Sequence, residues 1–116
     1  IDSYVFNAQI AQNLVISDQV MTQYFYIASE LITNLLKHSF PTSINMKLYV
    51  EGNQLKLQLK HDGIALSQRD YIALSKESEN LGLENIRYRL SMINGEILFN
   101  RTKTSGIIEI ITNLNN

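Results

Sequence analysis

The sequence predicts a single α/β domain, residues 1–116, built as a two-layer sandwich with about three helices on one face of a mixed, largely antiparallel β-sheet. Three observations predict it. A long amphipathic stretch before Pro41 has the period of a helix. Two pairs of alternating apolar segments, within 44–59 and 97–111, have the period of strands, and a second helical stretch lies between the pairs. The other sheet face is expected to be poorly covered or open to solvent.

Composition narrows the possible functions. The chain has 116 residues, 45% of them hydrophobic and 18% charged, as in a soluble domain with one core. A formal net charge of −1 gives no bulk attraction to nucleic acid or anionic lipid, so neither is an expected partner. There is no cysteine, which excludes disulfides and thiolate metal sites. No stretch has the length of a membrane span, and we expect this chain, which begins at Ile1, to be a piece of a longer protein.

The first elements follow from local patterns. Residues 3–16 are rich in β-branched and aromatic residues and predict one or two strands, without fixing where they break. Ser17 and Asp18 give a helix start, and the helix is expected to run to about Phe40, because Pro41 forbids its continuation and moves Phe40 out of the helical region.

The remaining elements alternate between strand and helix. Residues 44–50 and 55–59 alternate around a turn at Gly52, which predicts a β-hairpin that ends near residues 60–63. Residues 67–78 are either a short helix or a mobile loop. Residues 81–93 have a helical apolar face closed by Asn94 and Gly95, and 97–101 with 107–111 predict a second hairpin.

Polar groups that could take part in binding or catalysis occur in three separate places. Glu30, Asn34 and Lys37 form a narrow stripe on the long helix, opposite a broad apolar arc. Such a stripe is also what an ordinary solvated helix face looks like. Asp62 and Gly63 follow a strand, and residues 80–85 open a helix with a glycine, where free N–H groups favour an anion.

Taken in order and spacing, these pieces resemble the ATP-binding catalytic domain of sensor histidine kinases, in the GHKL ATPase superfamily. Residues 30–38, Glu-Leu-Ile-Thr-Asn-Leu-Leu-Lys-His, resemble the N box of that family. Residues 61–65, His-Asp-Gly-Ile-Ala, occupy the place of its first glycine box, and residues 80–89, ending in Arg89, resemble the second. The likeness covers the chain from about Tyr4 and is greatest to the kinases related to nitrate-responsive and lipid-responsive sensors. It implies the Bergerat-type ATP-binding fold.

The resemblance also implies roles for individual residues. Asn34 would hold Mg²⁺ through its carboxamide oxygen, and Glu30 would take a proton from, or orient, the acceptor imidazole. Lys37 would neutralise triphosphate charge. Gly82 and the N–H groups near it would cradle phosphate. The nucleotide-binding residues implied in addition are His38, His61, Asp62, Gly63, Asn80 and Leu83.

The chain departs from the family pattern at the nucleobase end. The family has an aspartate that accepts the adenine amino hydrogen where this chain has His61, and an imidazole is a weaker acceptor. Losing that bond would cost about 1–3 kcal/mol of ATP binding. Asp62 is a possible substitute only if the strand has already ended, because neighbouring strand residues point to opposite faces. Ala65 and Asn80 stand where the boxes have glycines.

The implied function is transfer of the ATP γ-phosphoryl group to a histidine in two-component signalling. The acceptor would lie on a separate dimerisation domain of the same protein, through which it forms a homodimer, and a response regulator would be the next partner. The domain is expected to be cytoplasmic, with any membrane anchor elsewhere in the parent. Two alternatives remain open here: a scaffold module that no longer binds nucleotide, and a serine kinase acting on an anti-sigma-factor antagonist.

Overall fold

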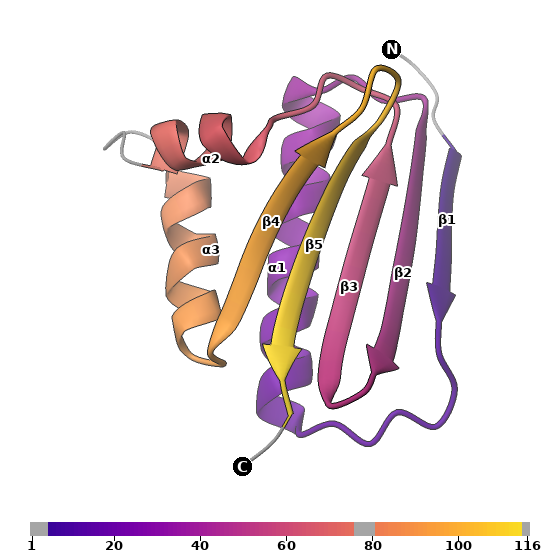
Figure 1. Cartoon of the computed structure of the whole chain (residues 1–116), viewed down its shortest axis with the longest axis vertical. Helices are drawn as coiled ribbons and strands as arrows, with labels where there is room; N and C mark the ends of the chain where they lie inside the picture. Colours follow the sequence, from indigo (N-terminus) through magenta and orange to yellow (C-terminus); the bar gives the residue numbers. More distant parts are fainter. Residues whose placement is uncertain (1–4, 76–80, 115–116) are drawn as a thin grey trace.

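The computed structural model describes residues 5–75 and 81–114, and it confirms the predicted two-layer α/β sandwich (Figure 1). In chain order the elements are β1 (Val5–Ile10), α1 (Asp18–His38), β2 (Ser43–Glu51), β3 (Gln54–His61), α2 (Gln68–Ser75), α3 (Leu81–Ser91), β4 (Gly95–Arg101) and β5 (Gly106–Asn113).

The five strands of the described chain form one sheet in the order β1-β2-β3-β5-β4. Only β1 and β2 pair in parallel, and the other three pairings are antiparallel. Figure 1 shows α1 crossing behind the middle strands and α3 beside β4. The last residue of β3, His61, pairs with Gly106, the first residue of β5. Those strand ends lie beside the C-terminal half of α1, which sets the position of the site described below (Figure 1).

Helix α1 begins and ends where the sequence indicates. The Ser17 hydroxyl accepts a hydrogen bond from the Val20 N–H at 3.3 Å, which is the usual N-cap interaction. At the other end, the Ser39 N–H donates to the Leu35 carbonyl at 2.9 Å. Phe40 then has a φ of 50°, outside the right-handed helical region, as expected before Pro41.

The core lies between the sheet and the helices. Its fully enclosed side chains come from α1, the strands and α3; they include Ile27, Ile44, Leu55, Leu59, Ile86 and Ile110. Tyr24 ties α1 to the sheet, since its hydroxyl oxygen lies 3.0 Å from the Leu55 carbonyl oxygen and 2.9 Å from the Thr112 hydroxyl oxygen. Burial raises the pKa of Tyr24 to about 12, so the hydroxyl keeps its proton at neutral pH.

Two choices left open by the sequence are decided. Residues 11–17 contain no strand, so β1 is the single strand of the N-terminal stretch, and Leu14 and Ile16 pack on the core from irregular backbone. Residues 68–75 form helix α2. Its start is closed by a reciprocal capping pair, in which the Asp70 N–H donates to the Ser67 hydroxyl at 3.2 Å and the Ser67 N–H donates to the Asp70 carboxylate at 3.3 Å.

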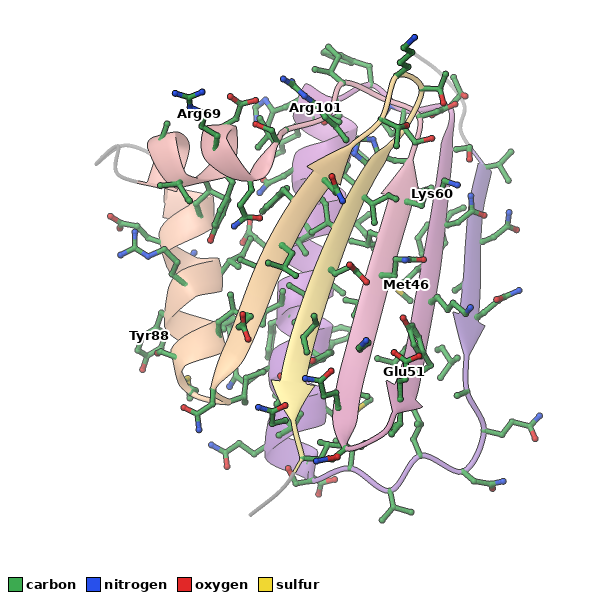
Figure 2. All side chains as sticks on the ribbon, viewed as in Figure 1. Met46, Glu51, Lys60, Arg69, Tyr88 and Arg101 are labelled. Carbon is green, nitrogen blue, oxygen red and sulfur yellow. The ribbon has the colours of Figure 1, made fainter. Side chains whose placement is uncertain are left out.

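The opposite face of the sheet carries no helix within the described ranges (Figure 1). A Lys56–Glu51 ion pair with an N–O distance of 2.6 Å lies on the β2–β3 hairpin. On the outer side of α3, Tyr88 points away from the sheet and is 68% exposed (Figure 2). Arg69 and Arg101 lie near the opposite end of the molecule from Tyr88 (Figure 2). None of the helices in the described ranges combines the length and apolarity needed to cross a membrane.

Candidate nucleotide-binding site

A cavity of about 330 Å³ opens between the C-terminal half of α1, the end of β3, the start of α3 and the β4–β5 hairpin. Its lining is largely apolar, with polar groups at its two ends. The lining residues are Leu31, Asn34, Leu35, His38, Ser39, His61, Ile64, Leu66, Leu83, Phe99, Ile107 and Ile108. A mostly apolar hollow with a few convergent polar groups is the usual form of a small-molecule site.

One polar end lies where α1 meets the start of α3. A Cβ on Gly82 would lie 3.2 Å from the Glu30 carboxylate oxygen Oε2 and 3.5–3.6 Å from the carboxamide atoms of Asn34. The two α1 side chains are one helical turn apart, so both face the first turn of α3. The structure therefore brings together Glu30, Asn34 and Gly82, three groups that the sequence spacing had placed in two distant motifs.

The other polar end is His61, whose side chain is only 3% exposed. Its ring nitrogen Nδ1 accepts a hydrogen bond from the Gly63 N–H at 3.1 Å. Burial lowers the pKa of His61, and the nearby Asp62 only partly opposes this, so the imidazole is neutral at pH 7. The neighbouring Gly106 leaves room for the ring, because a Cβ there would lie 2.5 Å from Nε2.

The Asp62 carboxylate is bonded to the start of β2 and does not line the cavity. Strand β3 ends at His61, and the Asp62 side chain turns out of the sheet toward the start of β2. Its carboxylate accepts hydrogen bonds from the Thr42 hydroxyl and from the N–H groups of Thr42 and Ser43, the latter two at 2.8 and 3.0 Å. These bonds, led by that of the Thr42 hydroxyl, hold the pKa of Asp62 below its usual range. Asp62 is an exposed clamp on this loop.

The path of the backbone requires a glycine at position 63. A Cβ at this position would lie 2.3 Å from the Ser39 carbonyl oxygen, so only glycine lets the turn approach the end of α1. The next residue uses this approach, as the Ile64 N–H donates to the same carbonyl at 2.8 Å. The turn after β3 is thereby fastened to the C-terminus of α1.

Comparison with known proteins identifies the fold. No family model matches the sequence, and no curated protein matches it. Solved structures do match. The histidine kinase domain of a blue-light activated histidine kinase from Erythrobacter litoralis has a TM-score of 0.79 at 22% identity, over 97% of this chain and 52% of that chain. The Acinetobacter baumannii histidine kinase AdeS has a TM-score of 0.81 at 18% identity, over 98% of this chain and 56% of that chain.

A mycobacterial sensor histidine kinase, MprB, matches with a TM-score of 0.72 at 15% identity, over 94% of this chain and 81% of that chain. The chain has the fold of a histidine kinase catalytic domain. It spans about half the length of the first two of these structures. The histidine kinase fold expected from the three sequence motifs is thus confirmed.

Within this histidine kinase fold the remaining predicted site residues fall into three groups. Leu83 and His38 line the cavity, Leu83 from the first turn of α3 and His38 from the last turn of α1. Lys37 has an exposed side chain in the last turn of α1 and does not line the cavity. Asn80 lies outside the described residues.

Sequence reasoning missed two parts of the site. The apolar walls, for example Leu31, Leu35 and Phe99, have the periodicity of ordinary core residues, so no pattern separates them from the core. The second part is a hollow of about 230 Å³ on the outer side of α1 and α3, lined by Tyr26, Ser29, Glu30, Thr33, Asn85 and Arg89. Glu30 thus borders this hollow on one side and Gly82 on the other.

Arg89 gives that outer hollow a fixed wall. Its guanidinium carbon lies 4.2 Å from the centre of the Tyr26 ring, and its Nη1 donates to the Gln23 side-chain oxygen at 3.0 Å. Gln23 is itself 7% exposed, so a buried side-chain amide holds the Arg89 guanidinium in place against the Tyr26 ring.

The chemistry of the site also fits a single Mg²⁺ ligand. Among the described residues there is no group of three or more acidic, histidine or cysteine side chains that would bind a metal unaided. Asn34 offers one carboxamide oxygen at the cavity, beside the start of α3. Mg²⁺ characteristically uses one or two protein oxygens and takes its other ligands from phosphates and water, so this donor set fits an ion that arrives with a nucleotide.

Proposed function

We propose that this chain is the catalytic domain of a sensor histidine kinase, which binds a Mg²⁺–nucleoside triphosphate, ATP in the family, and transfers its γ-phosphoryl group to a histidine on another domain. The observation that carries the proposal is the contact of Glu30 and Asn34 with the first turn of α3, at the polar end of a largely apolar cavity. An apolar hollow suits a nucleobase, and free helix N–H groups suit phosphates.

The residues divide the work by position. The N–H groups of the first turn of α3, near Gly82 and Leu83, bind phosphate oxygens. Asn34 would hold Mg²⁺ through its carboxamide oxygen, and the ion would supply neutralising charge for phosphoryl transfer. Lys37 adds a mobile positive charge at the end of α1, in reach of the triphosphate only after its side chain reorients.

Glu30 is the residue that faces the acceptor. Its carboxylate lies between the start of α3 and the outer hollow walled by Tyr26 and Arg89. An acceptor imidazole that enters the outer hollow would meet Glu30 before it met the phosphate, so Glu30 accepts its proton or fixes its orientation. The nucleotide and the acceptor thus approach the same carboxylate from opposite sides.

The partners follow from this division. The acceptor histidine belongs to a dimerisation domain of the same protein, which forms the homodimer, and a response regulator receives the phosphoryl group next. The domain works in the cytoplasm, and any membrane anchor belongs to the rest of the parent.

The test combines binding and transfer. Calorimetric titration of the chain with Mg²⁺ and non-hydrolysable triphosphate analogues should show binding. Asn34→Ala should weaken binding in the presence of Mg²⁺ and abolish phosphoryl transfer in the full-length parent. Glu30→Gln should retain nucleotide binding but lose transfer. Thr22→Ala, an exposed position on the same helix, is the matched control and should change neither.

Two results would contradict the proposal. Transfer that survives in Asn34→Ala would remove Asn34 from the machinery. If the folded chain binds no triphosphate of any base, the scaffold alternative is favoured instead. The contact of Glu30 and Asn34 with Gly82 would then have no role in catalysis.

A further inference from the structure

We infer that the nucleobase end of the cavity reads a hydrogen-bond acceptor at position 6 of a purine, so that 6-oxopurine nucleotides (guanosine or inosine triphosphates) bind better than adenosine triphosphate. This inference rests on the proposed function and concerns the base alone. It is carried by the hydrogen bond that fixes the orientation and tautomer of His61.

The tautomer follows from one contact. The Gly63 N–H donates to Nδ1 of His61 at 3.1 Å, so Nδ1 needs a free lone pair. Rotating the ring by 180° would put a C–H group against that N–H, so the bond also fixes the orientation of the ring. A neutral imidazole carries one proton, and with Nδ1 acting as acceptor that proton is on Nε2. His61 therefore presents a donor where the family presents an acceptor.

The Nε2 atom is not fully enclosed. It lies beside Gly106, 2.5 Å from where a Cβ of that residue would be. Within the described ranges Nε2 has no hydrogen-bond partner, and the one fully enclosed side-chain polar atom without a partner is the Tyr71 hydroxyl. Nε2 is thus not sealed in the core, and His61 is among the residues that line the cavity.

Purine edges differ in what they offer to such a donor. Adenine has an amino group at position 6, which donates, whereas guanine and hypoxanthine have a carbonyl oxygen there, which accepts. An N–H that faces the adenine amino group leaves two donors opposed and unpaired in a water-poor pocket. Discrimination of this kind arises because the unpaired polar groups of the site are penalised.

Neither the Asp62 carboxylate nor the apolar walls beside His61 reverse this preference. The Asp62 carboxylate, the nearest acceptor along the chain, is turned to Thr42 and Ser43. The walls beside His61, Ile64, Leu66 and Ile107, carry no polar side-chain atoms. The polar side chains of His38 and Ser39 line the cavity from the end of α1.

The experiment is a set of calorimetric titrations of this chain with Mg²⁺ and the β,γ-imido analogues of ATP, GTP and ITP. We expect the ITP and GTP analogues to bind about three- to tenfold more tightly than the ATP analogue, the size of one neutral hydrogen bond gained against a lost one. His61→Asp should reverse the order, because a carboxylate accepts from an amino group. His61→Asn should bring the affinities together, since its amide can present either edge.

The purine riboside triphosphate, which lacks any group at position 6, separates two ways of binding adenine. If Nε2–H bonded to adenine N1, this analogue and the ATP analogue would both bind more tightly than the ITP analogue, and the inference would be overturned. A tighter ATP analogue in the unaltered chain overturns it as well. So does binding that appears only in His61→Asp, which would leave the phosphate end of the proposed function intact.

Two controls complete the design. Lys60→Ala alters the exposed neighbour of His61 on β3 and should leave the order of affinities unchanged (Figure 2). Asp62→Asn should also leave the order unchanged, and a selective loss of the ATP analogue there would assign the base to Asp62 and overturn the inference. Absence of binding for every analogue and every variant would contradict the proposed function itself.

Discussion

The two ends of the cavity are held together in different ways. At the end proposed to take the nucleobase the contacts are tighter: a Cβ on Gly63 would meet the backbone carbonyl oxygen of Ser39 at 2.3 Å, and one on Gly106 would meet Nε2 of the His61 side chain at 2.5 Å. At the phosphate end the nearest atoms to Gly82 belong to side chains, and the tightest approach is 3.2 Å to the Glu30 carboxylate. Backbone cannot move aside, whereas a carboxylate on two methylenes can.

One end of the site is therefore rigid, whereas the other can adapt. The path of the chain fixes where the His61 ring lies, so its donor cannot be withdrawn to accommodate a different base. The Glu30 and Asn34 side chains can rotate to follow a triphosphate and its ion. Base selectivity should thus depend on the identity of one residue, and phosphate binding on several adjustable ones.

The largest expected effect is that of Gly63→Ala. The added methyl would overlap the Ser39 carbonyl, which already accepts the Ile64 N–H, and overpacking against backbone costs about 3 kcal/mol or more in free energy of unfolding. Urea unfolding followed by circular dichroism would measure it. Gly52→Ala is not a suitable control, because Gly52 has a φ of 62°, so Asn53→Ala in the same exposed turn serves instead. A Gly63→Ala variant as stable as the parent would refute the close approach.

Gly106→Ala should come second. Its methyl would press on side-chain atoms of His61 and Ala65. Side chains can relax in part, so the loss in free energy of unfolding should be limited to about 1–3 kcal/mol. The same variant should lose base selectivity, because the ring must leave its bond to the Gly63 N–H. The paired measurements are unfolding by urea and titration with the inosine and adenosine analogues. A loss of stability of the expected size with unchanged base selectivity would contradict the placement of the ring.

A smaller effect is expected from pH. The pKa of His61 is lowered from 6.5 by burial, so the unfolded chain binds a proton at a higher pH than the folded one does. Stability is therefore highest above about pH 6.5 and falls as the pH drops through the lower folded-state pKa. Thermal melts between pH 8 and pH 5 should show this loss.

His61→Asn serves as the control for that titration. The variant keeps His38, the other histidine, and the Asp62 carboxylate, so the difference between the two curves isolates His61. Equal pH dependence in both proteins would show that His61 titrates normally and is less enclosed than described.

The smallest effect on stability is expected from Gly82→Ala. The Glu30 carboxylate can give way by a few tenths of an ångström, so the free energy of unfolding should change by less than about 1 kcal/mol. Triphosphate affinity should fall for every base alike, because the methyl lies against Glu30 and Asn34. If Gly82→Ala changed the order of affinities among the bases, the two ends of the cavity would not act separately.

How far the sequence predicts this molecule depends on the kind of interaction. Periodicity predicted the helices and hairpins because each depends on local pattern, and the resemblance to the histidine kinase motifs implied that Glu30, Asn34 and Gly82 meet. The choice at residues 67–78 was decided by the Ser67–Asp70 capping pair, a signal present in the sequence but not used. Local signals of this kind could have been read in advance.

Other features had no local signal. Asp62 turns away from the cavity because the start of β2, twenty residues earlier in the chain, offers it two N–H groups and a hydroxyl. The second possible strand before α1 is replaced by irregular backbone because Leu14 and Ile16 find places on the core. The donor character of His61 depends on a bond between side chain and backbone within one turn. Each of these is a three-dimensional contact that no spacing in the sequence specifies.

The clamp made by Asp62 also has a mechanical consequence. The Val5 N–H donates to the Thr42 carbonyl at 2.8 Å, so the first hydrogen bond of β1 and the Asp62 clamp meet at the same residue. All six residues of β1 are exposed, so little packing opposes a pull on this strand. Tension applied to β1 would be carried by its pairing with β2 and, at Thr42, by the Asp62 carboxylate. The edge strand is thus linked, through Thr42 and Asp62, to the turn that directly follows His61.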